Sequence, residues 1–267
     1  MANKQFLKLL KISILFLPSL ISAQNWEKIN EFNIKNAPTS YAADIQGNFY
    51  LGFADGSLAK YNSRGILQEN YSLSNVSAIS LIDVQNNLKP FLFYFDNQQI
   101  TVLDRFSSVP KNYDISDLGV QFGMMACPSP DGDFWMVENN PQRLKKINPL
   151  RKAIVLEVQI SIGDSIKKIQ AYQNLLFIAD EMGIHFFDQF GGFLRSHLIQ
   201  GLLNFQVRDG ILFVYTNEEL REYSLSKSEV LNSVKLPELK PDAILKLKDN
   251  SLFIRNKKLT FYQLNEN

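Results

Sequence analysis

The sequence predicts an all-β protein, a six-bladed β-propeller in which each blade has four strands. A short apolar triplet recurs along the chain roughly every 40 residues, and this period with short strands is typical of one small sheet repeated around an axis. Glycine, asparagine or aspartate precedes most of the triplets, as expected for tight turns, and no long window shows helical periodicity. The triplets are centred on Tyr50, Leu92, Trp135, Phe177, Phe213 and Phe253.

The first repeat shows how four strands fit within one period. Gly47 lies in a tight turn before the second strand, and Asp55-Gly56 is a strong hairpin signal before the third. The segments between these turns are short and alternate between apolar and polar residues, which favours half-buried strands over helices. In the third repeat, residues 115–120 are expected to form at most a short helical turn. The strands expected in the first blade are residues 40–44, 49–53, 57–61 and 66–73.

The sixth repeat is incomplete. The chain reaches Leu264 before any residues remain for a fourth strand, whereas residues 26–34 have the pattern of the missing one. A ring left open would expose two sheet edges, and unpaired edges are a site of aggregation. We therefore expect residues 26–34 to complete the last blade and to close the ring.

Residues 1–23 are predicted to be a secretory signal peptide. Lys4, Lys8 and Lys11 form a basic start, residues 12–21 form an apolar run, and Ser22-Ala23 is a small-residue cleavage site. The apolar run is shorter than the ~20 residues that span a membrane, although an uncleaved anchor is the alternative. No cysteine lies near the cleavage site, so a bacterial lipid anchor is not expected.

Residues 24–267 are expected to form a single propeller domain, since a chain of this length can bury a large core. The net charge of the whole sequence is +1 with both signs interspersed, which argues against a nucleic-acid partner. Cys127 is the only cysteine, so no internal disulfide can form and the core alone must hold the fold. No second apolar run of spanning length follows the signal peptide, so we expect no transmembrane segment in the mature chain.

Part of the sequence resembles known proteins. Residues 44–51 (DIQGNFYL), then residues 56–62 (GSLAKYN) and Gly65, look like a blade of NHL-type or quinoprotein-type propellers. The resemblance covers all six repeats loosely and the first closely. It implies the propeller fold and says little about activity, because propellers host many functions. The Ala-Gln that follows the apolar run is similar to the signal-peptide ends of exported Bacteroidota proteins.

Histidine and cysteine are too few to indicate a metal centre or a reactive nucleophile. His185 and His197 are the only histidines, and they fall on neighbouring strands of the fourth repeat where they could face each other. A metal site usually needs more ligands at defined spacing, so we expect each histidine to face solvent or to be satisfied locally. Cys127 falls near the innermost strand of the third repeat, but no nearby cation lowers its pKa, which favours a buried core residue. No Ser/His/Asp arrangement and no phosphate-binding loop is recognisable.

Asp131 and Asp133 flank Gly132 in a segment that resembles the Asp-box of sialidase-like propellers, with one residue missing. In that family the box stabilises a hairpin and does not catalyse. Calcium would need several further oxygen ligands, so turn chemistry is the expected role of both acids. Trp135 is expected to be the core aromatic of this repeat. A glycosidase would need two carboxylates at a defined separation, which the sequence does not identify.

The residues that recur build the core, so function is expected in the loops, which do not recur. We expect a non-catalytic protein-binding or scaffold subunit of a bacterial cell-envelope complex, with an envelope or outer-membrane protein as partner and with no cofactor. The resemblance to exported Bacteroidota proteins implies an outer-membrane or type IX secretion assembly. The alternatives are a carbohydrate-active or quinone-dependent enzyme, and a small-ligand binder that uses the propeller channel.

The protein is expected to be periplasmic or secreted, and in the envelope hypothesis it is peripheral at the outer membrane. Two further expectations concern its surface. Ser165 lies in Asp164-Ser165-Ile166, which matches the O-glycosylation pattern of exported Bacteroidota proteins. Several large apolar residues lie near loops, where they either cap the blades or form a partner-facing patch. These residues are Phe106, Met124, Met125, Phe190 and Phe193.

Overall fold

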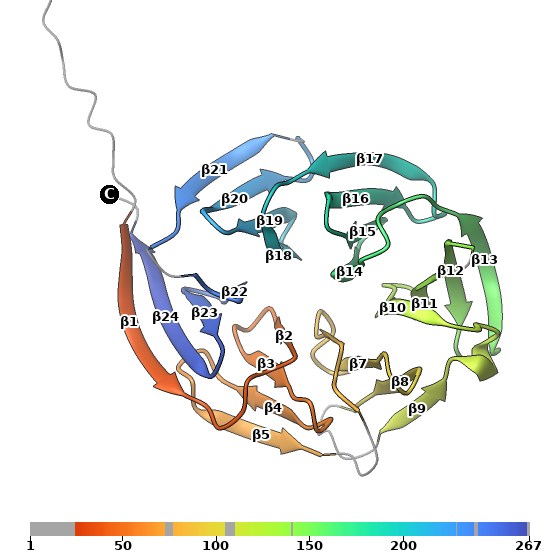
Figure 1. Cartoon of the computed structure of the whole chain (residues 1–267), viewed down its shortest axis with the longest axis horizontal. Helices are drawn as coiled ribbons and strands as arrows, with labels where there is room; N and C mark the ends of the chain where they lie inside the picture. The colour runs from red at the N-terminus through yellow and green to blue at the C-terminus, as the bar shows by residue number, and fades with distance from the viewer. Residues whose placement is uncertain are drawn as a thin grey trace, which may run out of the picture.

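Six four-stranded antiparallel sheets surround a central axis in the computed structural model (Figure 1). The structure describes residues 25–72, 77–104, 110–139, 141–227, 229–237 and 240–265, so the predicted signal peptide lies outside the described residues. The six-bladed propeller predicted from the sequence is confirmed, with four strands in every blade. Within the described residues, no helix is long and apolar enough to span a membrane.

The first five blades each use four strands that are consecutive in the chain. Those of blades one and two are β2 (Ser40–Ala43), β3 (Phe49–Gly52), β4 (Leu58–Tyr61), β5 (Leu67–Tyr71), β6 (Leu81–Asp83), β7 (Phe91–Tyr94), β8 (Gln99–Val102) and β9 (Lys111–Asp114). Those of blade three are β10 (Gly123–Pro128), β11 (Phe134–Glu138), β12 (Arg143–Asn148) and β13 (Ala153–Gln159), preceded by a short 3₁₀ helix, η1 (Ser116–Leu118). Those of blades four and five are β14 (Lys168–Tyr172), β15 (Leu175–Ala179), β16 (Gly183–Asp188), β17 (Phe193–Leu198), β18 (Leu202–Arg208), β19 (Ile211–Thr216), β20 (Glu219–Ser224) and β21 (Val230–Lys235).

Blade six joins the two ends of the described chain. Its order is β22 (Ala243–Lys246), β23 (Ser251–Arg255), β24 (Lys258–Asn265) and β1 (Asn25–Asn33), with β1 antiparallel to β24. The predicted closure by the N-terminal strand is therefore confirmed. Two aromatic side chains of β1 also reach the neighbouring blades. The Trp26 indole N–H donates to the Lys235 carbonyl of blade five at 2.7 Å, and the Phe32 ring packs 6.3 Å from the ring of Tyr61 in blade one.

The apolar triplets form the second strand of each blade and build the core. Their central residues Tyr50, Leu92, Trp135, Phe177, Phe213 and Phe253 are all between 0% and 7% exposed. A second strand has a partner strand on each side and a neighbouring blade against each face, so its side chains are buried whichever way they point. This explains why the triplets are apolar throughout and do not alternate with polar residues.

A β-bulge recurs where the third strand meets the outermost strand. It is present in blades one, three, four, five and six, and in each case it leaves one residue of the outer strand without a partner. Such bulges redirect side chains and disrupt the edge of a sheet, where unpaired strands would otherwise aggregate. The unpaired residues are Gln68, Val155, Leu194, Leu231 and Ile29 in blade order.

Candidate functional site

The innermost strands line the central channel, and amide side chains bridge them from blade to blade. Gln170 of β14 donates to the Val207 carbonyl at 3.2 Å and accepts from the Val207 N–H at 3.3 Å. Gln206 of β18 makes the same pair of bonds with Lys246 of β22, at 3.2 and 2.8 Å. Gln85 donates across the channel to the Ala171 carbonyl at 2.6 Å. These amides therefore tie the inner strands together, which leaves them unavailable as free catalytic groups.

Two charged groups are desolvated beside this ladder of amides. Burial raises the pKa of the Asp83 carboxyl to about 6, although the Gln85 N–H donates to it and Lys168 attracts its charged form. Burial also lowers the pKa of Lys168 to about 8, against the attraction of Asp83. The Lys168 ammonium donates to the Phe205 carbonyl at 2.7 Å. Perturbed groups of this kind gather at functional sites, so the channel is one candidate site.

Asp83→Asn is expected to stabilise the protein at about pH 7 by on the order of 1–3 kcal/mol and to change little at about pH 4. The folded pKa of Asp83 lies above its ordinary value, so its contribution to stability is full below about pH 4 and is lost as the pH rises through about 6. Asparagine imitates the protonated carboxyl and removes that loss. Denaturant unfolding at the two pH values measures the difference. Asp209→Asn, at a side chain 74% exposed, is the control, and an equal effect of Asp83→Asn at both pH values would contradict the assignment.

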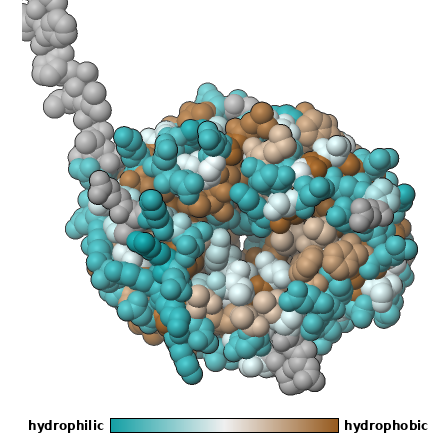
Figure 2. Space-filling model, in the orientation of Figure 1, coloured by the Kyte–Doolittle hydropathy of each residue, from teal (hydrophilic) through white to brown (hydrophobic). Residues whose placement is uncertain are grey.

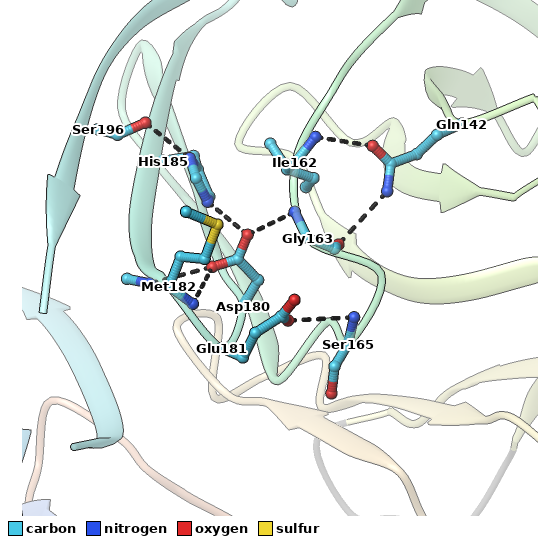
Figure 3. A network of polar contacts seen from close by, with 10 residues as sticks. Gln142, Ile162, Gly163, Ser165, Asp180, Glu181, Met182, His185 and Ser196 are labelled. Atoms are coloured by element: carbon cyan, nitrogen blue, oxygen red, sulfur yellow. Dashed lines mark hydrogen bonds and ion pairs between the residues drawn. The ribbon is translucent and has the colours of Figure 1, made fainter. Parts of the chain in front are cut away.

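A second candidate is a Ser/His/Asp network at the junction of blades three and four (Figure 3). His185 Nε2 lies 2.6 Å from Asp180 Oδ2, and His185 Nδ1 lies 2.7 Å from Ser196 Oγ. Asp180 is fully buried and also accepts three backbone N–H bonds, at 2.7 Å from Gly163, 2.8 Å from Met182 and 3.0 Å from Gly183. Because the carboxylate is used so fully within the fold, we assign the network a structural role.

The network was not recognisable in the sequence, because its members come from three separate elements. Asp180 directly follows the second strand of blade four, β15, whereas His185 lies on β16 and Ser196 on β17. The register of the sheet pairs His185 with Ser196. The expected satisfaction of His185 by local partners is confirmed. The sequence signal that was available is Asp180, an aspartate that follows a buried strand, with Gly183 three residues later. In the structure Gly183 has a φ of 155°.

The two histidines do not meet. His197 pairs with Ile184 in the sheet and so lies on the opposite face from His185, which corrects the suggestion that they could face each other. Its ring packs against Phe186 and Tyr223, with centroids 4.8 and 5.6 Å away. Burial, with the nearby charge of Arg195, lowers the pKa of His197. The arrangement indicates a packing role.

The remaining titratable candidates are engaged within the fold. Cys127 is fully buried, and burial raises the pKa of its thiol well above the ordinary value, as expected for a core residue. Asp131 pairs with Lys146, and Asp133 accepts from the Asn148 side chain at 2.7 Å. No group of three or more His, Cys, Asp or Glu side chains within the described residues could hold a metal ion.

Ser165 is exposed in the segment that leads into blade four. Its backbone N–H donates to the Glu181 carboxylate at 3.2 Å, and in Figure 3 its hydroxyl points away from that carboxylate. Such a position leaves the hydroxyl accessible, while its glycosylation stays a prediction. Phe106, the first of the apolar residues noted near loops, lies outside the described residues.

The outer wall of blade four carries a third candidate, which we call the β17 patch. It consists of five large apolar side chains along the outermost strand and the two turns beside it. Figure 2 shows hydrophobic residues along the rim where Figure 1 places β17 and β21. Its members and their exposed fractions are Met182 55%, Phe190 66%, Phe193 59%, Leu194 50% and Leu198 73%.

The exposure of the apolar residues near loops separates the methionines from the phenylalanines. Met125 is 8% exposed and belongs to the core, and Met124 packs against that core, as expected for residues that cap a blade. Phe190 and Phe193 are 66% and 59% exposed, although the Phe193 ring also packs against the buried Phe187. Their exposure favours a partner-facing patch.

The complete ring places the chain in the class of six-bladed β-propellers. Its structure is similar to a streptogramin B lyase, with a TM-score of 0.65 and 12% sequence identity, over 90% of this chain and 98% of that one. It is also similar to virginiamycin B lyase from Staphylococcus aureus, with a TM-score of 0.62 and 13% identity, over 90% of this chain and 100% of that one. No protein-family model and no curated protein matches the sequence. At these identities the likeness shows a shared fold, one that supports enzymes as well as binding proteins.

Proposed function

We propose that this protein is a non-catalytic binding subunit of a bacterial cell-envelope assembly, and that the β17 patch is where its protein partner docks. The observation that carries the proposal is the concentration of five half-exposed or more exposed apolar side chains on one blade. Single exposed apolar residues are normal on soluble proteins, whereas several gathered on one blade favour an interaction surface.

The shape of the β17 patch favours a protein as the occupant. The patch follows the length of an outer strand from the turn at Phe190 to Leu198, and it forms a convex rim with no enclosing walls (Figure 1). Small ligands bind in concave sites, so a rim of this shape fits a second protein surface. Val155 and Leu231 occupy the equivalent bulge position in blades three and five, at 42% and 48% exposure. A partner that covers β17 therefore meets further apolar contacts on either side.

The enzyme alternative has less support from the described residues. The similar structures are lyases by name, which makes catalysis on this fold an alternative hypothesis. The polar side chains that a channel enzyme would use are bonded between blades, as at Gln170 and Gln206. The Asp180 carboxylate is likewise saturated by bonds within the fold. The envelope setting, in an outer-membrane or type IX secretion assembly, rests on the predicted signal peptide and the resemblance of its end to exported Bacteroidota proteins.

Replacing Leu194 and Leu198 together by glutamate is expected to weaken partner binding at least about tenfold. Burying each leucine in an interface contributes about 1.5–3 kcal/mol, and a glutamate there must also be desolvated. Both side chains are at least half exposed, so the melting temperature should stay within about 2 °C of the original. The measurement is site-specific photo-crosslinking from position 193, a patch residue that the double variant leaves free to carry the probe, in native envelopes, followed by reciprocal purification of the cross-linked protein.

Gln68→Glu is the matched control for this experiment. Gln68 occupies the same bulge position as Leu194, but it lies in blade one and it is polar. A photo-crosslinker at position 68 should leave the partner unlabelled. The proposal is wrong if the double variant retains the same partner, or if the original protein elutes from envelopes as a free monomer. A cross-link between two copies of this chain would show that the β17 patch mediates self-association and that the partner is not a different protein.

A further inference from the structure

The end of the channel where the inner strands begin contains a small space that is partly open to solvent. A cavity of about 90 Å³ lies between the starts of β2, β6, β14 and β18, so four of the six blades contribute to it. Water occupies ~30 Å³ per molecule in the liquid, so the space suits about three waters or one compact polyatomic ion. Its polar lining includes Ser40, Ser80, Lys167, Lys168 and Asn204.

The cavity has two ammonium groups and no carboxylate among the residues that line it. Lys167 donates to the Leu202 carbonyl at 3.1 Å. Lys168 donates to the Phe205 carbonyl at 2.7 Å and contacts the Asn204 side-chain oxygen at 3.4 Å. Each of these acceptors is neutral, and within the described part of the chain neither lysine forms a direct ion pair, although Asp83 lies close enough to Lys168 to favour its charged form. Each ammonium carries three N–H donors, so each has a donor left for a ligand beyond these acceptors.

A hydroxyl group adds a donor on the opposite side of the cavity. It is not that of Ser40, whose Oγ is buried against Gly52, where a Cβ would lie 2.4 Å from it. The Ser80 Oγ accepts from the Phe95 N–H at 3.1 Å, which leaves its own proton available.

We propose that this cavity binds a small oxyanion, a carboxylate or phosphate group, held by Lys167 and Lys168. Charge-assisted hydrogen bonds from ammonium groups to such an anion are among the stronger ones in proteins. The anion would balance the charge of Lys167 and would add to the attraction that Asp83 exerts on Lys168. Water can fill the same volume, but it cannot neutralise the charge. The inference is independent of the β17 patch, which lies on the outer wall of blade four.

The test is calorimetric titration of the purified full-length protein with inorganic phosphate and, separately, with acetate. Both titrations are run at constant ionic strength with chloride as the balancing ion, because a screening effect alone would be the same for all anions. We expect saturable binding of at least one of the two oxyanions with a one-to-one stoichiometry. Phosphate binding alone identifies the phosphate class, and acetate binding alone identifies the carboxylate class.

One variant locates the binding to the cavity. Lys167→Gln is expected to weaken the affinity by about tenfold. It should fold, because Lys167 is exposed. Lys152→Gln is the control, at a lysine 58% exposed that pairs with Asp117. Absence of saturable binding for both anions, or equal weakening by Lys152→Gln, overturns the proposal.

A spectroscopic measurement on Lys168 gives a readout that does not depend on the variants. Burial lowers the pKa of Lys168 in the anion-free protein to about 8. An anion beside the ammonium favours its charged form, so NMR of the labelled side chain should show the pKa rising when phosphate or acetate is added. A Lys168 pKa that stays unchanged at saturating anion would contradict a site at this end of the channel.

Discussion

Removal of residues 25–33 is expected to lower the melting temperature by at least about 10 °C, the largest effect of any change considered for this protein. Strand β1 supplies the fourth strand of blade six, and every residue that pairs with it belongs to β24. Without β1, β24 becomes an unpaired edge strand. Two large aromatic side chains are lost at the same time, and each such loss from a packed position costs about 3–5 kcal/mol.

The expected effect exceeds that of losing one edge strand because β1 connects three blades. Trp26 packs edge-to-face on Phe253, with centroids 5.4 Å apart, and bonds to the Lys235 carbonyl of blade five. Phe32 lies between Phe261 of blade six and Tyr61 of blade one. Gly65 is required beneath that ring, since a Cβ there would lie 2.3 Å from Phe32. The strand thus holds the last blade to both of its neighbours.

Differential scanning calorimetry of the shortened and original chains measures this effect. Ile29→Ser is the control, because Ile29 lies on the same strand but at the unpaired bulge position and is 51% exposed. It should melt within about 2 °C of the original. Trp26→Ala and Phe32→Ala should each reproduce part of the loss. An unchanged melting temperature for the shortened chain would show that the ring does not depend on this closure.

Asp180→Ala is expected to cost about 3–5 kcal/mol of unfolding free energy, as much as the loss of a large packed aromatic side chain. The carboxylate accepts bonds from the backbone of Gly163, Met182 and Gly183 and contacts His185. Alanine would leave four polar groups without their partner at a position where Asp180 itself is fully buried. Met182, Gly183 and His185 belong to blade four, whereas Gly163 lies in the segment that connects blade three to blade four. The substitution therefore also loosens the junction between these two blades.

Asp188→Ala is the matched control for Asp180→Ala. Asp188 also accepts two backbone N–H bonds in a turn of blade four, from Phe190 and Gly192, both at 2.8 Å. It has neither the histidine nor the link to blade three, so we expect a cost of about 1 kcal/mol. Urea unfolding of the three proteins gives the comparison. Equal costs for the two substitutions would contradict the assignment of Asp180 as the residue that joins the blades.

The same carboxylate makes stability depend on pH at the acid end. Burial opposes ionisation of Asp180, but the N–H donors of Gly163 and Met182 and the contact with His185 outweigh it, and its pKa lies below the ordinary value. The stabilisation is therefore present above the unfolded pKa and is lost as the pH falls through the folded pKa. Asp180→Ala should accordingly lose less stability on acidification than the original protein does.

The fold was predictable from local signals, and the reason is physical. Asp55-Gly56 and Gly47 set hairpin turns through backbone conformations that depend on few neighbours. The apolar triplets mark the strands that are buried on both faces. The closure followed from residues 26–34, because an incomplete blade and an unpaired strand must be satisfied together. The observed strand, Asn25–Asn33, differs from that prediction by one residue at each end.

The candidate sites were decided only by the tertiary structure. Ser40 and Lys168 lie 128 positions apart in the chain, and they line one cavity because their strands both begin at the same end of the channel. His185 meets Ser196 and not His197 because a shift of one residue in register moves a side chain to the other face. Leu194 is exposed because a bulge leaves it unpaired. The sequence by itself determined the ring and how it closes, since period, turns and burial are local properties. Which polar and apolar groups face one another was determined by the packing of the blades.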